Sequence, residues 1–133
     1  MVMVVVDSAD EVCSITILGS TGSVGCSTVS LIEADRERYV VEAITANRNV
    51  DRLAEQARRL RPRLAVIADE GLYSELKVAL AGTGVESAAG ASGLLEAADM
   101  PAERVMAAIV GAAGLAPILT SVRRGATVAL ANK

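Results

Sequence analysis

The chain has 133 residues, enough for one domain of ordinary size, and 52% of them are hydrophobic although only two are aromatic. Its formal net charge of −3 excludes a strongly basic surface of the kind that binds nucleic acid or anionic membranes. The sequence contains no histidine, so no imidazole within these residues can act as a general base or a metal ligand.

The first 13 residues are expected to form a loosely held leader ahead of the domain. Their apolar run, residues 1–6, lacks a basic flank and is too short for a signal-peptide core or a membrane span. Cys13 and Cys26 are too isolated to suggest a disulfide scaffold. Cys26 is expected to pack as a small apolar residue, with a reactive thiol as the alternative. We therefore expect a cytoplasmic protein without membrane or nucleic-acid partners.

The first predicted strand covers residues 14–18, and a glycine-rich run with the pattern G-x-x-G-x-x-G follows it at residues 19–25. A helix is predicted over residues 24–35. Its apolar face is expected to carry Val24, Thr28, Leu31 and Ile32. Glycines allow the tight turn, and the N-terminal N–H groups of a helix can bind phosphate. The pattern therefore predicts a nucleotide-phosphate site, with a turn that binds no ligand as the alternative.

A second strand is predicted over residues 39–45, and the run T-A-N-R-N spans its carboxyl end at residues 45–49. Sites for NAD usually place an acidic residue here to bind the ribose 2′-hydroxyl, and this run has none. Arg48 would instead attract a 2′-phosphate through charge-assisted hydrogen bonds, which favours NADP(H). The alternative is an arginine that is merely solvated. Asn49 is expected to cap the next helix, which ends before Pro62.

Four arginines lie near the end of that second helix, at positions 58, 59, 61 and 63. A phosphate-binding patch is one interpretation of this cluster. A solvated helix face is the favoured one, because Glu55 and Arg59 have the i, i+4 spacing of a helical ion pair.

The rest of the chain continues the alternation of strands and helices. Strands are predicted over residues 64–68, 85–89, 105–110 and 126–131. Helices are predicted from a cap at Asp69 to near Gly82, over residues 92–98, and from a first turn containing Pro117 to Gly125. One face of the last helix carries Leu115, Ile118, Leu119 and Val122, and a second glycine-rich turn precedes it at residues 111–114. This order predicts a single-domain α/β fold with a doubly wound parallel sheet, Rossmann-like in kind.

Four phrases occur in the order of a known family: ILGSTGSVG at residues 17–25, ANRNV at 46–50, MAAIVGAAGL at 106–115 and ALANK at 129–133. Together they resemble the amino-terminal domain of the 1-deoxy-D-xylulose 5-phosphate reductoisomerase family, from about Ser14 onward. The resemblance implies NADPH as the cofactor and, in the complete enzyme only, a divalent metal, Mg²⁺ or Mn²⁺. It also implies conversion of the sugar phosphate 1-deoxy-D-xylulose 5-phosphate to 2-C-methyl-D-erythritol 4-phosphate, a step of non-mevalonate isoprenoid biosynthesis, by a homodimer.

The resemblance also assigns site residues, position by position. It implies that the cofactor's pyrophosphate is held by Thr21, Gly22, Ser23 and Val24. The 2′-phosphate end would be held by Asn47, Arg48 and Asn49. Asn132 would contact the cofactor near the nicotinamide, and Lys133 would contact the sugar-phosphate substrate. The family often has glycine at the position of Asn47, so the resemblance does not by itself imply a close backbone approach there. At the next position the family often has lysine or glycine, and Arg48 keeps the charge of the lysine.

The family pattern continues past Lys133 with Glu-Ser, and later with acidic metal ligands, a lid and a helical domain. None of these is present, and no convergent carboxylates replace them. We therefore expect a truncated cofactor-binding fragment with no catalytic residue and no metal ligand of its own. Two alternatives are a non-catalytic nucleotide-binding module and another NADP-dependent dehydrogenase that shares only the glycine loop. Surface that a second domain would cover is expected to be exposed and to favour self-association.

Overall fold

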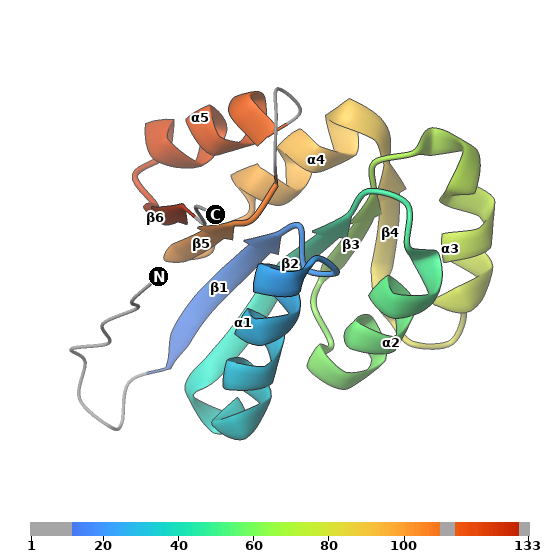
Figure 1. Ribbon diagram of the computed structural model, residues 1–133, viewed down its shortest axis with the longest axis horizontal. Helices are drawn as coiled ribbons and strands as arrows, with labels where there is room; N and C mark the ends of the chain where they lie inside the picture. The colour runs from blue at the N-terminus through green and yellow to red at the C-terminus, as the bar shows by residue number, and fades with distance from the viewer. Residues whose placement is uncertain (1–11, 110–113, 131–133) are drawn as a thin grey trace.

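The computed structural model describes residues 12–109 and 114–130, which form a six-stranded parallel sheet (Figure 1). The strand order is β4-β3-β2-β1-β5-β6, so the direction of winding reverses between β1 and β5. The strands are β1 (Cys13–Leu18), β2 (Tyr39–Ala46), β3 (Leu64–Ile67), β4 (Glu86–Ala89), β5 (Arg104–Ala107) and β6 (Thr127–Leu130). This order confirms the predicted doubly wound, Rossmann-like α/β fold.

Helices cover both faces of the sheet (Figure 1). One face carries α1 (Ser23–Ala34), α2 (Val50–Leu60) and α3 (Tyr73–Ala79), and the other carries α4 (Gly90–Asp99) and α5 (Leu115–Arg123). The core is accordingly divided into two clusters, one on each face of the sheet. Side chains of consecutive residues in a strand lie in different clusters. Ile17 packs in the cluster beneath α1 and α2, whereas Leu18 packs with Leu94 of α4. Strands buried on both faces explain why the sequence shows continuous apolar runs in place of an alternating pattern.

The buried face of α1 differs from the predicted one. Leu31 was expected to be on the inner face, but its side chain is 57% exposed and Val29 is buried instead. The buried positions of α1 are Gly25, Thr28, Val29 and Ile32. A Cβ on Gly25 would lie 2.1 Å from the carbonyl oxygen of Gly19, so the helix meets the glycine loop at this point. This close approach sets the rotation of α1 and turns Leu31 to the outside.

The apolar face of α5 is not its buried side. Leu115, Leu119 and Val122 are exposed, whereas Pro117 and Ser121 are buried. Polar contacts with the end of α4 explain this rotation: the Ser121 hydroxyl donates to the Ala98 carbonyl (3.2 Å), and Arg124 Nε donates to the same oxygen (2.8 Å). These bonds satisfy a carbonyl at the carboxyl end of α4, where intrahelical donors are absent.

Several predicted boundaries shift by a few residues. The β1 strand begins one residue earlier than predicted, at Cys13, and α4 already begins at Gly90. Asp69 does not cap α3 directly; its carboxylate accepts from the Gly71 N–H (2.9 Å) and caps a short 3-10 turn, Glu70–Leu72, that leads into α3. Residues 110 and 131 of the two predicted last strands lie outside the described residues.

The arginines near the end of α2 belong to a solvated surface, as the favoured interpretation predicted. Arg59 forms the expected ion pair with Glu55 (3.2 Å) and a second one with Glu33 of α1 (3.2 Å). Within the described ranges, the structure has no helix that is long and apolar enough to cross a bilayer.

Candidate functional site

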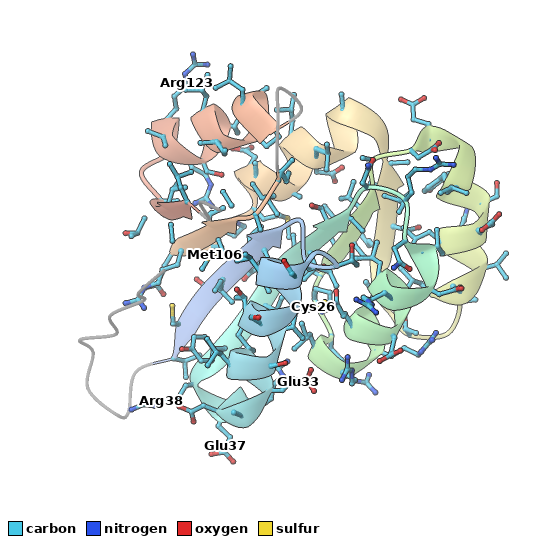
Figure 2. The ribbon with its side chains drawn as sticks, viewed as in Figure 1. Cys26, Glu33, Glu37, Arg38, Met106 and Arg123 are labelled. Carbon is cyan, nitrogen blue, oxygen red and sulfur yellow. The ribbon has the colours of Figure 1, made fainter. Side chains whose placement is uncertain are left out.

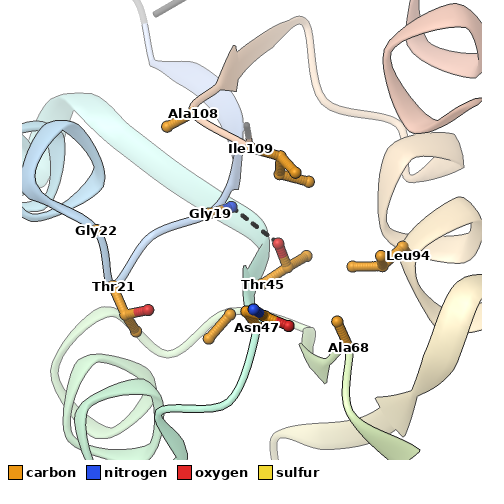
Figure 3. A pocket seen from close by; sticks show the side chains of 10 residues that line it. Gly19, Thr21, Gly22, Thr45, Asn47, Ala68, Leu94, Ala108 and Ile109 are labelled. Carbon is orange, nitrogen blue, oxygen red and sulfur yellow. Dashed lines mark hydrogen bonds between the residues drawn. The ribbon is translucent and has the colours of Figure 1, made fainter. Parts of the chain in front are cut away.

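A pocket of about 250 Å³ opens at the carboxyl edge of the sheet, next to the point where the winding reverses (Figure 3). Strands β1, β2, β3 and β5 all end at this edge, which is where doubly wound sheets bind their ligands. Its lining consists of Gly19, Thr21, Gly22, Thr45, Ala46, Asn47, Ala68, Leu94, Ala108 and Ile109. None of these side chains is titratable, so the lining of the pocket offers no acid or base of its own.

Two of the three glycines in the loop are required by packing within the chain. Gly19 has a φ of +86°, and a Cβ there would lie 2.9 Å from the Ala108 carbonyl oxygen. Gly25 leaves room for the close contact between α1 and the loop described above. These two glycines therefore hold the strand, the loop and the helix close together.

Gly22 is different, because the surrounding chain leaves open space at this position. The atom nearest to a Cβ on Gly22 would be the Gly19 carbonyl oxygen, 4.0 Å away. Gly22 lines the pocket and is the N-cap of α1, with no side-chain cap, and the first turn of the helix carries no acidic residue. The N–H groups of this turn are thus open to an anion, and the helix dipole favours negative charge there.

The predicted pyrophosphate residues are brought together at this helix end. Thr21 and Gly22 line the pocket, and Ser23 and Val24 are the first two residues of α1. Thr45 from β2 also supports the loop, because its hydroxyl accepts a hydrogen bond from the Gly19 N–H at 2.9 Å (Figure 3). The sequence reasoning had placed Thr45 in a strand without giving it this role.

The predicted 2′-phosphate residues lie at the neighbouring strand end. Asn47 lines the pocket, and the Asn49 side chain accepts from the Arg52 N–H (3.1 Å), which confirms it as the N-cap of α2. The Arg48 side chain is 74% exposed, and its Nε lies 3.3 Å from the Asp69 carboxylate.

Asp69 is a residue of this site that the sequence reasoning missed. The run of residues 45–49 contains no acid, but Asp69 comes directly after the segment that extends β3, and β3 pairs with β2 in parallel. The Asp69 N–H donates to the Asn47 carbonyl (3.0 Å), so the two strand ends are in contact. The ion pair is made through Nε of Arg48, and the side chain that carries the two terminal guanidinium nitrogens is largely exposed. Those nitrogens are the pair that can bind a phosphate in a bidentate way.

The apolar wall of the pocket was also not predicted. Ala68, Leu94 and Ala108 contribute to it from three separate elements, and the chain positions give no sign that they meet. Together with the helix N-terminus and Arg48, this wall fits an elongated ligand that carries phosphate groups and an apolar ring.

Two predicted positions and one turn cannot be placed. Asn132, Lys133 and residues 111–113 of the second glycine-rich turn lie outside the described residues. For the part of the chain that the structure describes, no group of three or more cysteine, aspartate, glutamate or histidine side chains is arranged to hold a metal ion.

Comparisons with known proteins identify the family. A family model described as 1-deoxy-D-xylulose 5-phosphate reductoisomerase matches residues 15–133. A curated protein of that name from Rhodospirillum centenum is 63% identical over 124 residues, which cover 93% of this chain and 31% of the relative. The chain thus spans about a third of the length of the curated relatives it matches.

Solved structures of the same family share the fold. The reductoisomerase from Zymomonas mobilis in complex with NADPH is 56% identical, with a TM-score of 0.90 over 92% of this chain and 32% of that chain. A reductoisomerase in complex with NADPH, fosmidomycin and magnesium is 36% identical, with a TM-score of 0.86 over 91% of this chain and 30% of that one.

Proposed function

Since this chain belongs to the 1-deoxy-D-xylulose 5-phosphate reductoisomerase family, we propose that it is the NADPH-binding part of such an enzyme. One observation carries the proposal: the open N-terminus of α1 and the terminal nitrogens of Arg48 lie at the same edge of the sheet, at the ends of neighbouring strands. NADPH has a pyrophosphate and a separate 2′-phosphate, which match these two anion-binding positions. The open space at Gly22 is where the pyrophosphate fits.

The proposal assigns each residue a part in binding. Backbone N–H groups around Gly22 bind the pyrophosphate, over the segment Thr21, Gly22, Ser23 and Val24. The 2′-phosphate is bound by Asn47, Arg48 and Asn49, with Arg48 providing the charge. Asn132 contacts the cofactor near its nicotinamide, and Lys133 contacts the sugar phosphate. Residues 14–133 form the NADP(H)-binding domain, preceded by a leader.

The activity of the whole enzyme is part of the same proposal. The complete protein would convert 1-deoxy-D-xylulose 5-phosphate to 2-C-methyl-D-erythritol 4-phosphate, as a homodimer with a divalent metal. Bound NADPH supplies the hydride for that reduction. In this proposal the described residues contribute the binding and orientation of the cofactor. A cytoplasmic location is part of the proposal, because NADPH is an intracellular reductant and Cys26 is not part of a disulfide.

A titration of this chain with NADPH and with NADH, followed by nicotinamide fluorescence, tests the cofactor assignment. NADPH should bind more tightly, and Arg48→Ala should raise its Kd about tenfold while leaving that of NADH within about twofold. Arg123→Ala is the matched control, since Arg123 is an exposed arginine on α5, on the opposite face of the sheet from α2 (Figure 2). Equal affinity for the two cofactors, or an Arg48→Ala variant that binds NADPH normally, would contradict the assignment.

A further inference from the structure

Gln56 of α2 is a buried polar side chain whose two ends both bind the glycine loop. It is only 2% exposed. Its Oε1 accepts from the Ser20 hydroxyl (2.7 Å), and its Nε2 donates to the Ser20 carbonyl (2.9 Å). A buried carboxamide destabilises a fold unless it is hydrogen-bonded, and both ends of this one are. Gln56 itself does not line the pocket, so it does not touch the proposed ligand.

Ser20 is held from the other side by the end of β2. Its N–H donates to the Thr45 carbonyl (2.7 Å), next to the bond between Gly19 and the Thr45 hydroxyl. Ser20 is completely buried. The first two residues of the loop are thereby fixed between β2 and α2 by hydrogen bonds within the chain.

The position of Ser20 determines where the N-terminus of α1 lies. A Cβ on Gly25 would approach the Cα and carbonyl carbon of Ser20 to 2.6 Å, so α1 rests directly on this residue. A shift of Ser20 would therefore move the first turn of α1, which directly follows the pocket-lining N-cap Gly22.

The same helix, α2, carries the proposed 2′-phosphate loop at its other end. Gln56 lies seven residues, or about two turns, after the N-cap Asn49. One rigid element therefore connects the glycine loop with the segment Asn47 to Asn49.

We propose that Gln56 is a positioning residue that holds the glycine loop, through Ser20, in the geometry that binds the cofactor's pyrophosphate. This inference rests on the proposed function and adds to it a residue that acts through the loop, without contact to the ligand. It follows that loss of Gln56 should lower the affinity for ligands that carry the pyrophosphate and leave unchanged the affinity for ligands that carry only the 2′-phosphate.

Binding of two probes to the full chain tests the proposal: NADPH, which has both phosphate groups, and 2′-AMP, which has only the 2′-phosphate. Gln56→Met keeps the size of the side chain and removes its two hydrogen bonds with Ser20, together with a longer one from Nε2 to the Cys26 sulfur (3.8 Å). Its NADPH Kd, measured by calorimetry, should rise about tenfold, the size expected from losing a buried hydrogen-bonded pair. Its 2′-AMP Kd should stay within about twofold of the wild type. Ser121→Ala is the control, because it removes a buried hydrogen bond to α4 and should change neither Kd.

Gln56→Glu gives a second readout that a purely structural role would not produce. A protonated carboxyl can donate its O–H to the Ser20 carbonyl and accept from the Ser20 hydroxyl, as the carboxamide does, whereas the ionised form lacks the donor. The ratio of the variant's NADPH Kd to that of the wild type should fall at least about threefold from pH 9 to pH 6.5.

The possible outcomes separate the two proposals. If the wild type prefers NADPH but Gln56→Met binds it equally well, the positioning role is wrong while the proposed function stands. The positioning role is also wrong if a folded Gln56→Met variant loses affinity for NADPH and for 2′-AMP by the same factor. It is wrong as well if the ratio of the Gln56→Glu NADPH Kd to that of the wild type is independent of pH. A wild-type chain without preference for NADPH would contradict the proposed function and, with it, this inference.

Discussion

Helices α1 to α3 each bury apolar side chains against one face of the sheet, although Leu31 of α1 and Val78 of α3 are exposed. On the other side of the molecule, α5 leaves Leu115, Leu119 and Val122 exposed. The first region is fixed by close packing around the glycine loop, with Ile32 fully buried. The second is fixed by polar bonds from Ser121 and Arg124 to carbonyls around the end of α4. The comparison shows that the apolar face of a helix need not become its buried face when polar anchors set the rotation.

The largest expected difference in the free energy of unfolding is between substitutions at two neighbouring residues of α1. Ile32→Ala should lower the free energy of unfolding by about 2–5 kcal/mol, because it removes a buried side chain and leaves a cavity. Leu31→Ala is the matched control and should change it by less than about 0.5 kcal/mol, since that side chain is 57% exposed. Urea unfolding of both variants measures the two values. Equal losses would show that α1 is rotated differently from the arrangement described.

Gly22→Asp should separate stability from cofactor binding in the same region. Aspartate is a good N-cap and its charge suits a helix N-terminus, so the stability of the fold should be unchanged or rise by a few tenths of a kcal/mol. The carboxylate would occupy the open space at Gly22 and repel the pyrophosphate, so the NADPH Kd should rise by at least about tenfold. Thermal unfolding and fluorescence titration give the two readings. Normal NADPH affinity in the folded variant would place the pyrophosphate elsewhere.

The smallest expected change in stability is on α5. The double substitution Leu115→Lys with Val122→Lys adds charge to two exposed positions and should alter the free energy of unfolding by less than about 0.5 kcal/mol. Light scattering should show that the wild type self-associates with rising concentration and that the variant does so less, because exposed apolar patches promote association. A wild type that remains monomeric at high concentration would contradict this expectation.

Much of the fold could be predicted because its signals are local. Apolar runs, a capping asparagine at position 49 and the glycine spacing of the first loop each depend on residues that are close in the chain. The i, i+4 pair of Glu55 and Arg59 is equally local, and it is present. The family phrases also gave the right cofactor-binding family, since residues 15–133 match its model.

The parts that could not be predicted depend on contacts between distant segments. Asp69 meets Arg48 because two parallel strands end at one edge, although 21 positions separate them in the sequence. Gln56 reaches Ser20 across 36 positions, from one helix to the loop before another. The rotation of α1, which exposes Leu31, follows from the approach of Gly25 to the loop.

The sequence by itself therefore determined the order of elements, the position of the glycine-rich loop before α1 and the family to which the chain belongs. Local propensity and a short glycine pattern are sufficient for these features. Only the tertiary structure decided which helix faces are buried, which acid stands beside Arg48 and which buried amide supports the loop. The physical reason is that packing brings together strand ends and helix faces that are far apart in the chain, and their rotation and register depend on contacts that no local pattern records.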